Sequence, residues 1–135
     1  MSGQIGFKVV TPEGTAVEKT VSFTKLMSIT GEIGVTPSHT PMLVILKPGK
    51  LMTRDINATE TTYFVPEGVA HITKKTITIM APFVEEKKTI DQKRAEAAKQ
   101  RAEDRIKKPK KETDTARAKA SLIRAENRLK VLLKD

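Results

Sequence analysis

Six charged and small residues in the last third of the chain have spacings that could build an anion site. Four share one helix face, at intervals of three, four and three residues: Asp91, Arg94, Ala98 and Arg101. Arg124 and Arg128, four residues apart, share a face of a second helical segment. Arginines donate parallel hydrogen bonds to phosphate and stay charged, so the spacing suits phosphate if the two helices pair. The alternative, left open by spacing alone, is two solvated faces with local pairs such as Asp91 with Arg94.

Other residue types offer little catalytic chemistry. The chain has no cysteine and two histidines, so disulfides, thiolate metal sites and cysteine nucleophiles are excluded. Lys50 follows Gly49 without the spacing of a phosphate-binding loop. Ser38 and His39 are adjacent, and adjacent residues rarely form a nucleophile-and-base pair, so we expect His39 to be an ordinary loop histidine. His71 falls in a strand as a packed or half-exposed residue, and we expect no catalytic or metal site.

The charge of the chain is concentrated in its tail. Over 135 residues, 25 Lys and Arg exceed 16 Asp and Glu, which gives a net charge of +9. Residues 85–135 hold 17 of the basic and 10 of the acidic residues. This balance predicts an anionic partner, which nucleic acid, a lipid surface, a phosphate ligand or an acidic protein face would each satisfy. The longest apolar run spans five residues, 42–46, so we expect no direct membrane insertion.

The segments before the tail, in residues 1–84, have the sequence pattern of β strands. All seven glycines and all five aromatic residues lie before Val84, among many Val, Ile and Thr residues. Alternating or half-apolar segments bounded by turn formers predict strands at 4–10, 50–57, 60–65, 69–73 and 76–81. Eight or more such segments predict an antiparallel β sandwich or flattened barrel over residues 1–84, and no parallel sheet.

Residues 85–135 read as an antiparallel hairpin of two helices. We expect Thr89 to cap the first helix and Pro109 to end it. We expect the second helix to begin near Asp114 or Thr115. Apolar residues recur at helical spacing on both segments: Ala95, Ala98, Ala102 and Ile106, then Ala118, Leu122, Ala125, Leu129 and Leu132. A seam this rich in alanine buries little apolar area, so the hairpin is expected to be marginal and able to detach from the sandwich.

Several segments together resemble one known family. Residues 31–43 read GEIGVTPSHTPML, 46–49 read LKPG, 10–14 read VTPEG and 90–95 read IDQKRA. With the strand at 76–81, these segments resemble the epsilon subunit of bacterial F-type ATP synthases over nearly the whole chain. The resemblance implies an α+β protein, a small β sandwich followed by a two-helix hairpin, in agreement with the independent assignment above.

The resemblance also implies partners. It suggests a noncatalytic central-stalk subunit that couples rotation to ATP synthesis, lying peripherally at the cytoplasmic face of the cell inner membrane. The sandwich would bind the gamma subunit and the membrane rotor ring, through a loop region of five residues: Glu32, Ser38, His39, Thr40 and Pro41. The hairpin would contact acidic segments of the catalytic beta subunits, and the alpha subunits, and inhibit ATP hydrolysis.

A regulatory nucleotide follows from the same resemblance. In several bacterial members an Ile/Leu-Asp-x-x-Arg-Ala motif with further arginines binds ATP and favours the folded, noninhibitory hairpin. Four residues match that motif directly and four occupy similar places: Ile90, Asp91, Arg94 and Ala95, then Glu85, Arg101, Arg124 and Arg128. ATP is thus expected as a regulatory ligand, with no cofactor required.

Two departures from the family pattern stand out. Ser38 replaces a small residue after the loop proline, and Glu67-Gly68 after Pro66 replaces a customary glycine pair. The first affects the expected rotor contact and the second the turn geometry.

The charge also fits a different class, a nucleic-acid-binding barrel with a basic helical arm. Aromatic residues are 4% of the chain and none lies in the tail, so such a protein would have a poor platform for stacking bases. We therefore expect no nucleic-acid partner. A small enzyme is a third interpretation, but it lacks a credible catalytic constellation.

Overall fold

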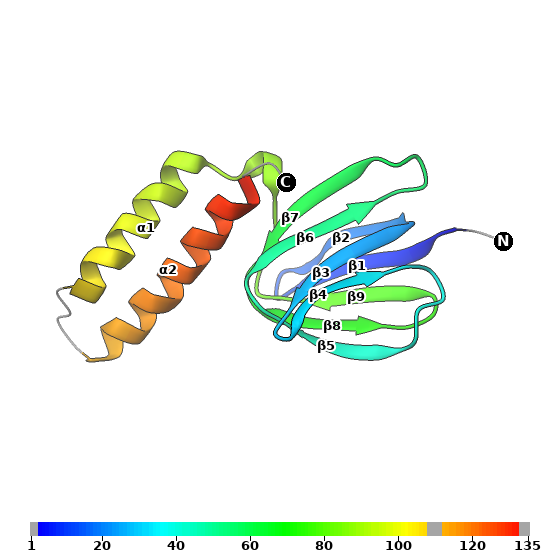
Figure 1. The fold of residues 1–135 in the computed structure, drawn as a ribbon, viewed down its shortest axis with the longest axis horizontal. Coiled ribbons are helices and arrows are strands. Elements are labelled where there is room, and N and C mark those ends of the chain that lie inside the picture. The colour runs from blue at the N-terminus through cyan, green and yellow to red at the C-terminus, as the bar shows by residue number, and fades with distance from the viewer. Residues whose placement is uncertain (1–2, 108–111, 133–135) are drawn as a thin grey trace.

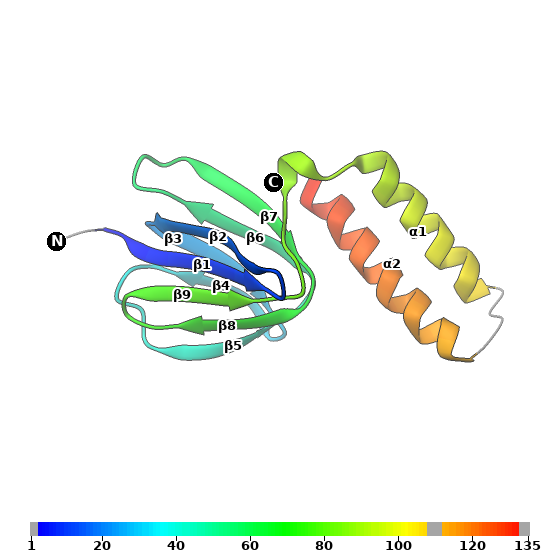
Figure 2. The same cartoon turned by 180° about the vertical axis from the view of Figure 1, so that it is seen from behind.

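The computed structural model describes residues 3–107 and 112–132. They form a curled β sheet and a helical hairpin that lie side by side (Figures 1 and 2). The N-terminal end of the sheet lies away from the hairpin, whereas the last turn of the second helix returns to the sheet. This arrangement confirms the predicted α+β fold, in which a β sandwich is followed by two helices.

Ten strands make up the sheet within the described residues: β1 (Ile5–Thr11), β2 (Gly14–Val21), β3 (Phe23–Ser28), β4 (Gly31–Val35), β5 (Met42–Leu46), β6 (Gly49–Arg54), β7 (Glu60–Val65), β8 (Gly68–Ile72), β9 (Thr76–Met80) and β10 (Glu85–Glu86). Their order is β10-β7-β6-β3-β5-β8-β9-β1-β2, with β4 paired to β3. The sheet curls so that one of its faces encloses the core. The strand β10 continues the sheet past the predicted boundary at Val84, because Glu85 and Glu86 pair with β7.

One pair departs from the expected antiparallel pairing. The strands β1 and β9 run parallel, with Phe7 opposite Ile77 and Val9 opposite Ile79. Nearly the whole sandwich separates these strands in sequence, so no short turn forces them to run in opposite directions. The other pairs are antiparallel.

The core lies inside the curl and is built by period-two alternation. In β1, Ile5, Phe7 and Val9 are buried, and in β9 Ile77 and Ile79 are buried, which confirms the alternation predicted for residues 76–81. The rings of Phe7 and Tyr63 lie 6.4 Å apart and close the two halves of the curl on one another.

A second buried apolar area lies on the outer face of the sheet. In β7, Tyr63 and Val65 belong to the core cluster inside the curl, whereas the intervening Phe64 is fully buried outside that cluster. Met52 of β6 is likewise buried outside it. The helix α2 (Glu112–Leu132) lies against β6 and β7, and its Val131 is 1% exposed. The hairpin therefore shields apolar side chains of the sandwich, beyond the alanine contacts within the hairpin.

The helical segment begins differently from the prediction. A 3-10 turn, η1 (Lys87–Thr89), precedes α1 (Gln92–Lys107). The predicted cap at Thr89 is wrong, because its hydroxyl donates to the Glu86 carbonyl at 2.7 Å. The cap is Asp91, whose Oδ1 accepts the backbone N–H of Arg94 at 3.1 Å. A carboxylate one residue before the helix satisfies an unpaired N–H and also suits the positive end of the helix dipole.

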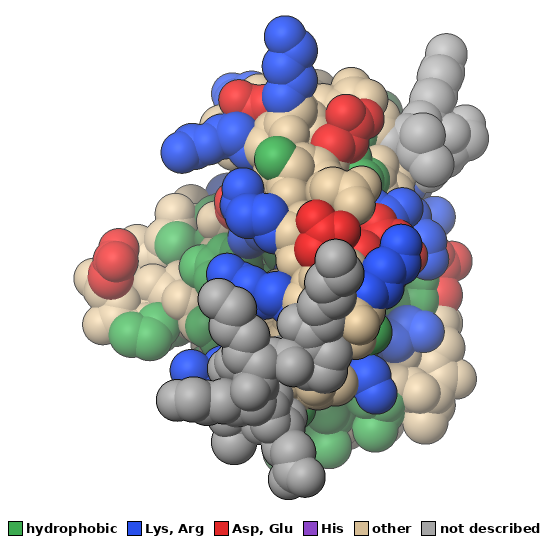
Figure 3. All heavy atoms as spheres, turned by 90° about the vertical axis from the view of Figure 1, so that its left-hand side faces the viewer, with side chains coloured by type: hydrophobic (Ala, Val, Ile, Leu, Met, Phe, Trp, Pro, Cys, Tyr) green, Lys and Arg blue, Asp and Glu red, His purple; other side chains and the backbone are tan. Residues whose placement is uncertain are grey.

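The two helices meet along an alanine seam. Ala95 and Ala102 of α1 and Ala118 and Ala125 of α2 are all buried, as their spacing predicted. The second helix begins at Glu112, before the predicted Asp114 or Thr115. The predicted break at Pro109 lies outside the described residues, and neither α1 nor α2 is long and apolar enough to cross a membrane. Seen from the hairpin side, Lys and Arg side chains surround the helices with Asp and Glu between them (Figure 3).

Candidate functional site

A cavity of about 280 Å³ lies where the first helix, the second helix and the end of the sheet meet. Nine residues line it: Glu85, Thr89, Ile90, Asp91, Arg94, Ala95, Ala98, Arg101 and Arg128. They come from β10, from η1 and the linker after it, from α1 and from α2. The structure thus brings together seven of the eight residues that the sequence assigned to a nucleotide site. Arg124 is the exception.

The first turn of α1 supplies one side of the cavity. Asp91 holds this turn at two points, since its side chain accepts the Arg94 N–H and its carbonyl accepts the Ala95 N–H at 3.0 Å. Arg94 and Asp91 are exposed, whereas Ala95 is buried in the seam. Ala95 and Ala98 are short side chains, which leave room between the arginines of α1 and α2. A helix N-terminus next to arginines favours an anion.

Arg128 forms the opposite side. Its Nε donates to Glu85 Oε1 at 2.6 Å, and its guanidinium lies over the rings of Phe64 and Phe83, at 5.1 and 5.3 Å from their centroids. About a quarter of the Arg128 side chain is exposed. Three arginines therefore line the cavity, Arg94, Arg101 and Arg128, together with two acidic residues, Glu85 and Asp91.

Arg124 is held elsewhere. Its Nη2 donates to Glu67 Oε1 at 2.6 Å, and Glu67 belongs to the turn between β7 and β8. Glu67 is the residue that departs from the customary glycine pair. The departure gives this chain an ion pair between hairpin and sandwich, and that pair draws Arg124 away from the cavity.

We expect this ion pair to contribute little to stability. Both side chains are well exposed, at 37% for Arg124 and 49% for Glu67. Solvent screens such pairs, so Glu67→Gln should lower the free energy of unfolding by less than about 1 kcal/mol. Urea denaturation at low and high salt would measure this. A larger loss, insensitive to salt, would show that Glu67 stabilises the β7–β8 turn and not the hairpin.

The predicted partner loop lies at the other end of the sandwich. The Ser38 backbone N–H donates to the Lys74 carbonyl at 3.3 Å, so the loop lies beside the turn between β8 and β9. At this turn β9 begins, opposite the start of β1. Ser38 adopts a φ of 66°, and His39 Nδ1 lies 2.7 Å from the Thr40 carbonyl. Thr40 and Pro41 are exposed, as is Glu32 in β4. His39 is thus the expected hydrogen-bonded loop histidine, whereas His71 in β8 is exposed and not packed.

An exposed apolar row on the outer face of the sheet was not predicted from the sequence. Ile45, Val69, Met80 and Val10 are in register across β5, β8, β9 and β1. Ile45 is 56% and Met80 47% exposed, and neighbouring Leu43 is 67% exposed. The uninterrupted apolar run at 42–46 was the available signal, since such a run predicts a strand with apolar residues on both faces. Contiguous exposed apolar residues on a folded sheet are typical of a docking surface.

Comparison with known proteins places both parts of the chain in one family. The family model for the ATP synthase delta/epsilon chain β-sandwich domain matches residues 4–87, and that for the delta/epsilon long α-helix domain matches residues 88–132. The chain therefore belongs to the delta/epsilon family of ATP synthase subunits. It is an epsilon-type chain, a subunit of the complex that is not itself catalytic.

Its relatives are named consistently. The ATP synthase epsilon chain of Desulfosudis oleivorans is 39% identical over 106 residues, 78% of this chain and 80% of that one. The epsilon chain of Ligilactobacillus salivarius is 38% identical over 102 residues, 76% of this chain and 73% of that one. The family assignment favours a stalk subunit over the alternative nucleic-acid-binding barrel.

Solved structures share the fold. A chain of the Euglena gracilis mitochondrial ATP synthase, in its OSCP/F1/c-ring part, has a TM-score of 0.88 at 19% identity and covers 98% of this chain and 84% of that chain. A chain from the central stalk and c-ring of the Tetrahymena thermophila mitochondrial ATP synthase has a TM-score of 0.61 at 14% identity, covering 96% of each.

Proposed function

We propose that the chain acts in the central stalk of a rotary ATP synthase, with the sandwich as its docking domain. The exposed apolar row of β5, β8, β9 and β1 would bind the gamma subunit. The loop around His39, with Glu32, would contact the membrane rotor ring. The exposure of these groups supports the proposal, and so does the similarity to chains solved in central-stalk and c-ring assemblies. Bound to the ring, the chain would lie at the cytoplasmic face of the membrane.

We further propose that the hairpin binds ATP in the cavity between α1, α2 and β10. One observation carries this proposal: three arginines from two helices line a cavity at a helix N-terminus, which Glu85 of the sheet also lines. Arg94, Arg101 and Arg128 would bind phosphate oxygens, and Asp91 would orient an arginine or select the adenine amine. The site is complete only while the hairpin is folded and docked on the sandwich.

Such a site would make the hairpin a regulator. A ligand that binds only the docked form stabilises it by RT ln(1 + [L]/Kd), about 2.7 kcal/mol at a hundredfold excess over Kd. An alanine seam with a small apolar interface is weak enough for that free energy to shift the equilibrium. With ATP absent, the hairpin would detach and extend toward acidic segments of the beta subunits, and the alpha subunits, and inhibit hydrolysis.

Calorimetry with ATP tests the nucleotide site. We expect binding to the full chain that weakens in Arg94→Ala by about 10- to 100-fold, since hydrogen bonds to charged groups contribute roughly 1.5 to 3 kcal/mol. Arg105→Ala is the matched control, because Arg105 is an exposed arginine of α1 that does not line the cavity. ATP at millimolar concentration that gives neither heat nor a rise in melting temperature would refute the nucleotide site and leave the docking proposal standing.

A further inference from the structure

The guanidinium of Arg128 is held on three sides by residues of the sandwich. Glu85 accepts its Nε–H, and the rings of Phe64 and Phe83 lie within 5.3 Å of its central carbon. The two rings also lie 6.1 Å from each other at an angle of 44°. Among the described residues, no other arginine lies against two aromatic rings and a carboxylate together.

Local backbone geometry explains why these three groups meet. Glu85 and Phe64 are direct cross-strand partners in the β10–β7 pair, so their side chains are neighbours. Phe83 precedes Glu85 by two residues, the spacing that returns a side chain to the same side of an extended segment. Phe64 points out of the curl because its neighbours Tyr63 and Val65 point in. The end of the sheet thus presents a carboxylate beside two aromatic rings that contact each other.

Such an environment fixes both the position and the orientation of the guanidinium. Aromatic faces attract a cation, by about 0.5 to 1 kcal/mol at exposed sites and about 2 kcal/mol or more when desolvated. Glu85 occupies the Nε–H, so an anion in the cavity would meet the terminal nitrogens of the guanidinium, which form one edge of its plane. Pre-ordering this edge removes an entropic penalty that a free arginine would incur on binding.

We propose that Phe64 and Phe83 are positioning residues for ligand binding, which act through Arg128 and touch no ligand themselves. The proposal rests on the nucleotide site proposed above, and extends it by linking ligand affinity to two aromatic residues of the sandwich. It also separates the two arginines of α2. Arg128 is oriented toward the cavity by the rings, whereas Arg124 is held by Glu67 outside it.

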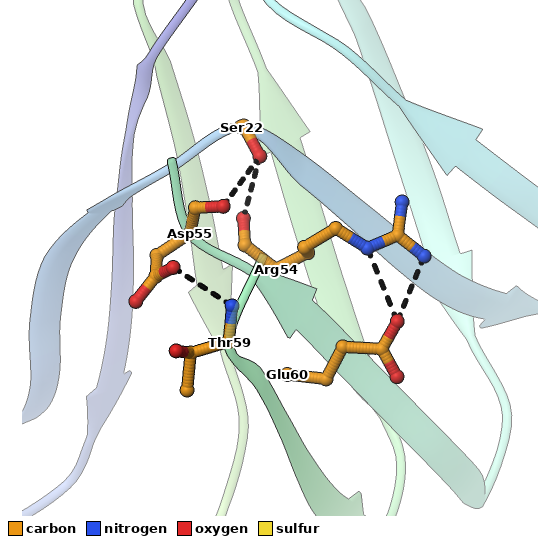
Figure 4. A network of polar contacts seen from close by, with 5 residues as sticks. All are labelled: Ser22, Arg54, Asp55, Thr59 and Glu60. Atoms are coloured by element: carbon orange, nitrogen blue, oxygen red, sulfur yellow. Dashed lines mark hydrogen bonds and ion pairs between the residues drawn. The ribbon is translucent and has the colours of Figure 1, made fainter. Parts of the chain in front are cut away.

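The sandwich contains a matched control away from the cavity. Arg54 donates through Nε and Nη2 to Glu60 Oε2, at 3.1 and 2.8 Å, and its guanidinium lies 5.2 Å from the Phe23 ring (Figure 4 shows Arg54 with Glu60). This group repeats the arginine, carboxylate and ring of the Arg128 site at a place that does not line the cavity. Phe23→Leu therefore removes an arginine–ring contact of the same length without touching the proposed site.

The experiment compares Phe83→Leu, Phe83→Tyr and Phe23→Leu in the full chain, with ATP and inorganic triphosphate as the probes in calorimetry. Phe83 is half-buried, whereas Phe64 is fully buried. Substituting Phe83 therefore disturbs the packing of the sandwich less than substituting Phe64. We expect Phe83→Leu to weaken both probes about 3- to 10-fold, from the cation–π contribution of one ring. Phe83→Tyr and Phe23→Leu should stay close to the original affinity. Progressive ring fluorination at position 83, which withdraws the ring charge at nearly constant shape, should weaken binding stepwise.

A second measurement reads the position of Arg128 without a ligand. The Nε–H signal of Arg128 in NMR spectra should be shifted by the ring currents and slow to exchange. Phe83→Leu should reduce the shift and speed the exchange, while Phe64 and Glu85 keep part of both. Unchanged affinity in Phe83→Leu, or no dependence on fluorination, would overturn the proposal and leave the rings as packing. If the unmodified chain binds no ATP or triphosphate, the nucleotide site fails. An Nε–H signal with the same shift and exchange rate in Phe83→Leu as in the original chain would separately refute the positioning role.

Discussion

Gly68→Ala should destabilise the folded chain by about 3 kcal/mol, at the upper end of the range for overpacking a well-packed site. A Cβ at this position would lie 2.4 Å from the Met80 carbonyl oxygen and 3.2 Å from the Ala81 Cβ. The Met80 carbonyl oxygen belongs to the backbone of the paired strand β9. Unlike a flexible side chain, it cannot move away by changing rotamer. The strands β8 and β9 would have to separate where Val69 pairs with Met80.

Thermal denaturation followed by circular dichroism would measure this loss, as a fall in melting temperature of roughly 10 °C for a chain of this size. Gly3→Ala is the matched control, because a Cβ there has nothing within 4 Å. A melting temperature unchanged by Gly68→Ala would mean that β8 and β9 separate easily in the middle of the exposed apolar row.

Truncation after Lys87 should abolish inhibition while leaving a folded sandwich. The residues of the core cluster all lie between Ile5 and Ala81, so the core does not depend on the hairpin. Keeping β10 preserves its pairing with β7. Exposure of Phe64 on loss of α2 should lower stability by about 1.5 to 3 kcal/mol without ending cooperative unfolding. When added to an ATP synthase that lacks this subunit, the truncated chain should assemble and leave ATP hydrolysis at the uninhibited rate, whereas the full chain should reduce it.

The reverse phenotype is expected from Ile45→Glu in the full chain. Ile45 belongs to the exposed apolar row and lies far in the fold from the nucleotide cavity, so a carboxylate there should weaken assembly while ATP binding persists.

Inhibition by the truncated chain equal to that by the full chain would refute the regulatory role of the hairpin. Loss of all cooperative structure on truncation would show that sandwich and hairpin share one folding unit.

The repeating patterns of the sequence determined the strands and helices. They also determined the part of the nucleotide cavity that one face of α1 supplies. Alternation in 76–81, the turn formers before Val84 and the alanines after it predicted a sandwich and a hairpin, because local periodicity decides which side of an element is apolar. Asp91, Arg94, Ala98 and Arg101 line one cavity because helical spacing alone places them together. The resemblance of 31–43 and 90–95 to the epsilon subunit supplied the family.

Only the tertiary structure decided which arginine of α2 faces the cavity. Arg124 and Arg128 have equivalent spacing, and helical periodicity contains no information about what lies across from them. Glu67 captures the first and Glu85, with Phe64 and Phe83, orients the second. The parallel β1–β9 pair and the apolar row from Ile45 to Val10 arise in the same way. Their partners are far apart in sequence, so the closing of the sheet, and no local preference, brings them together.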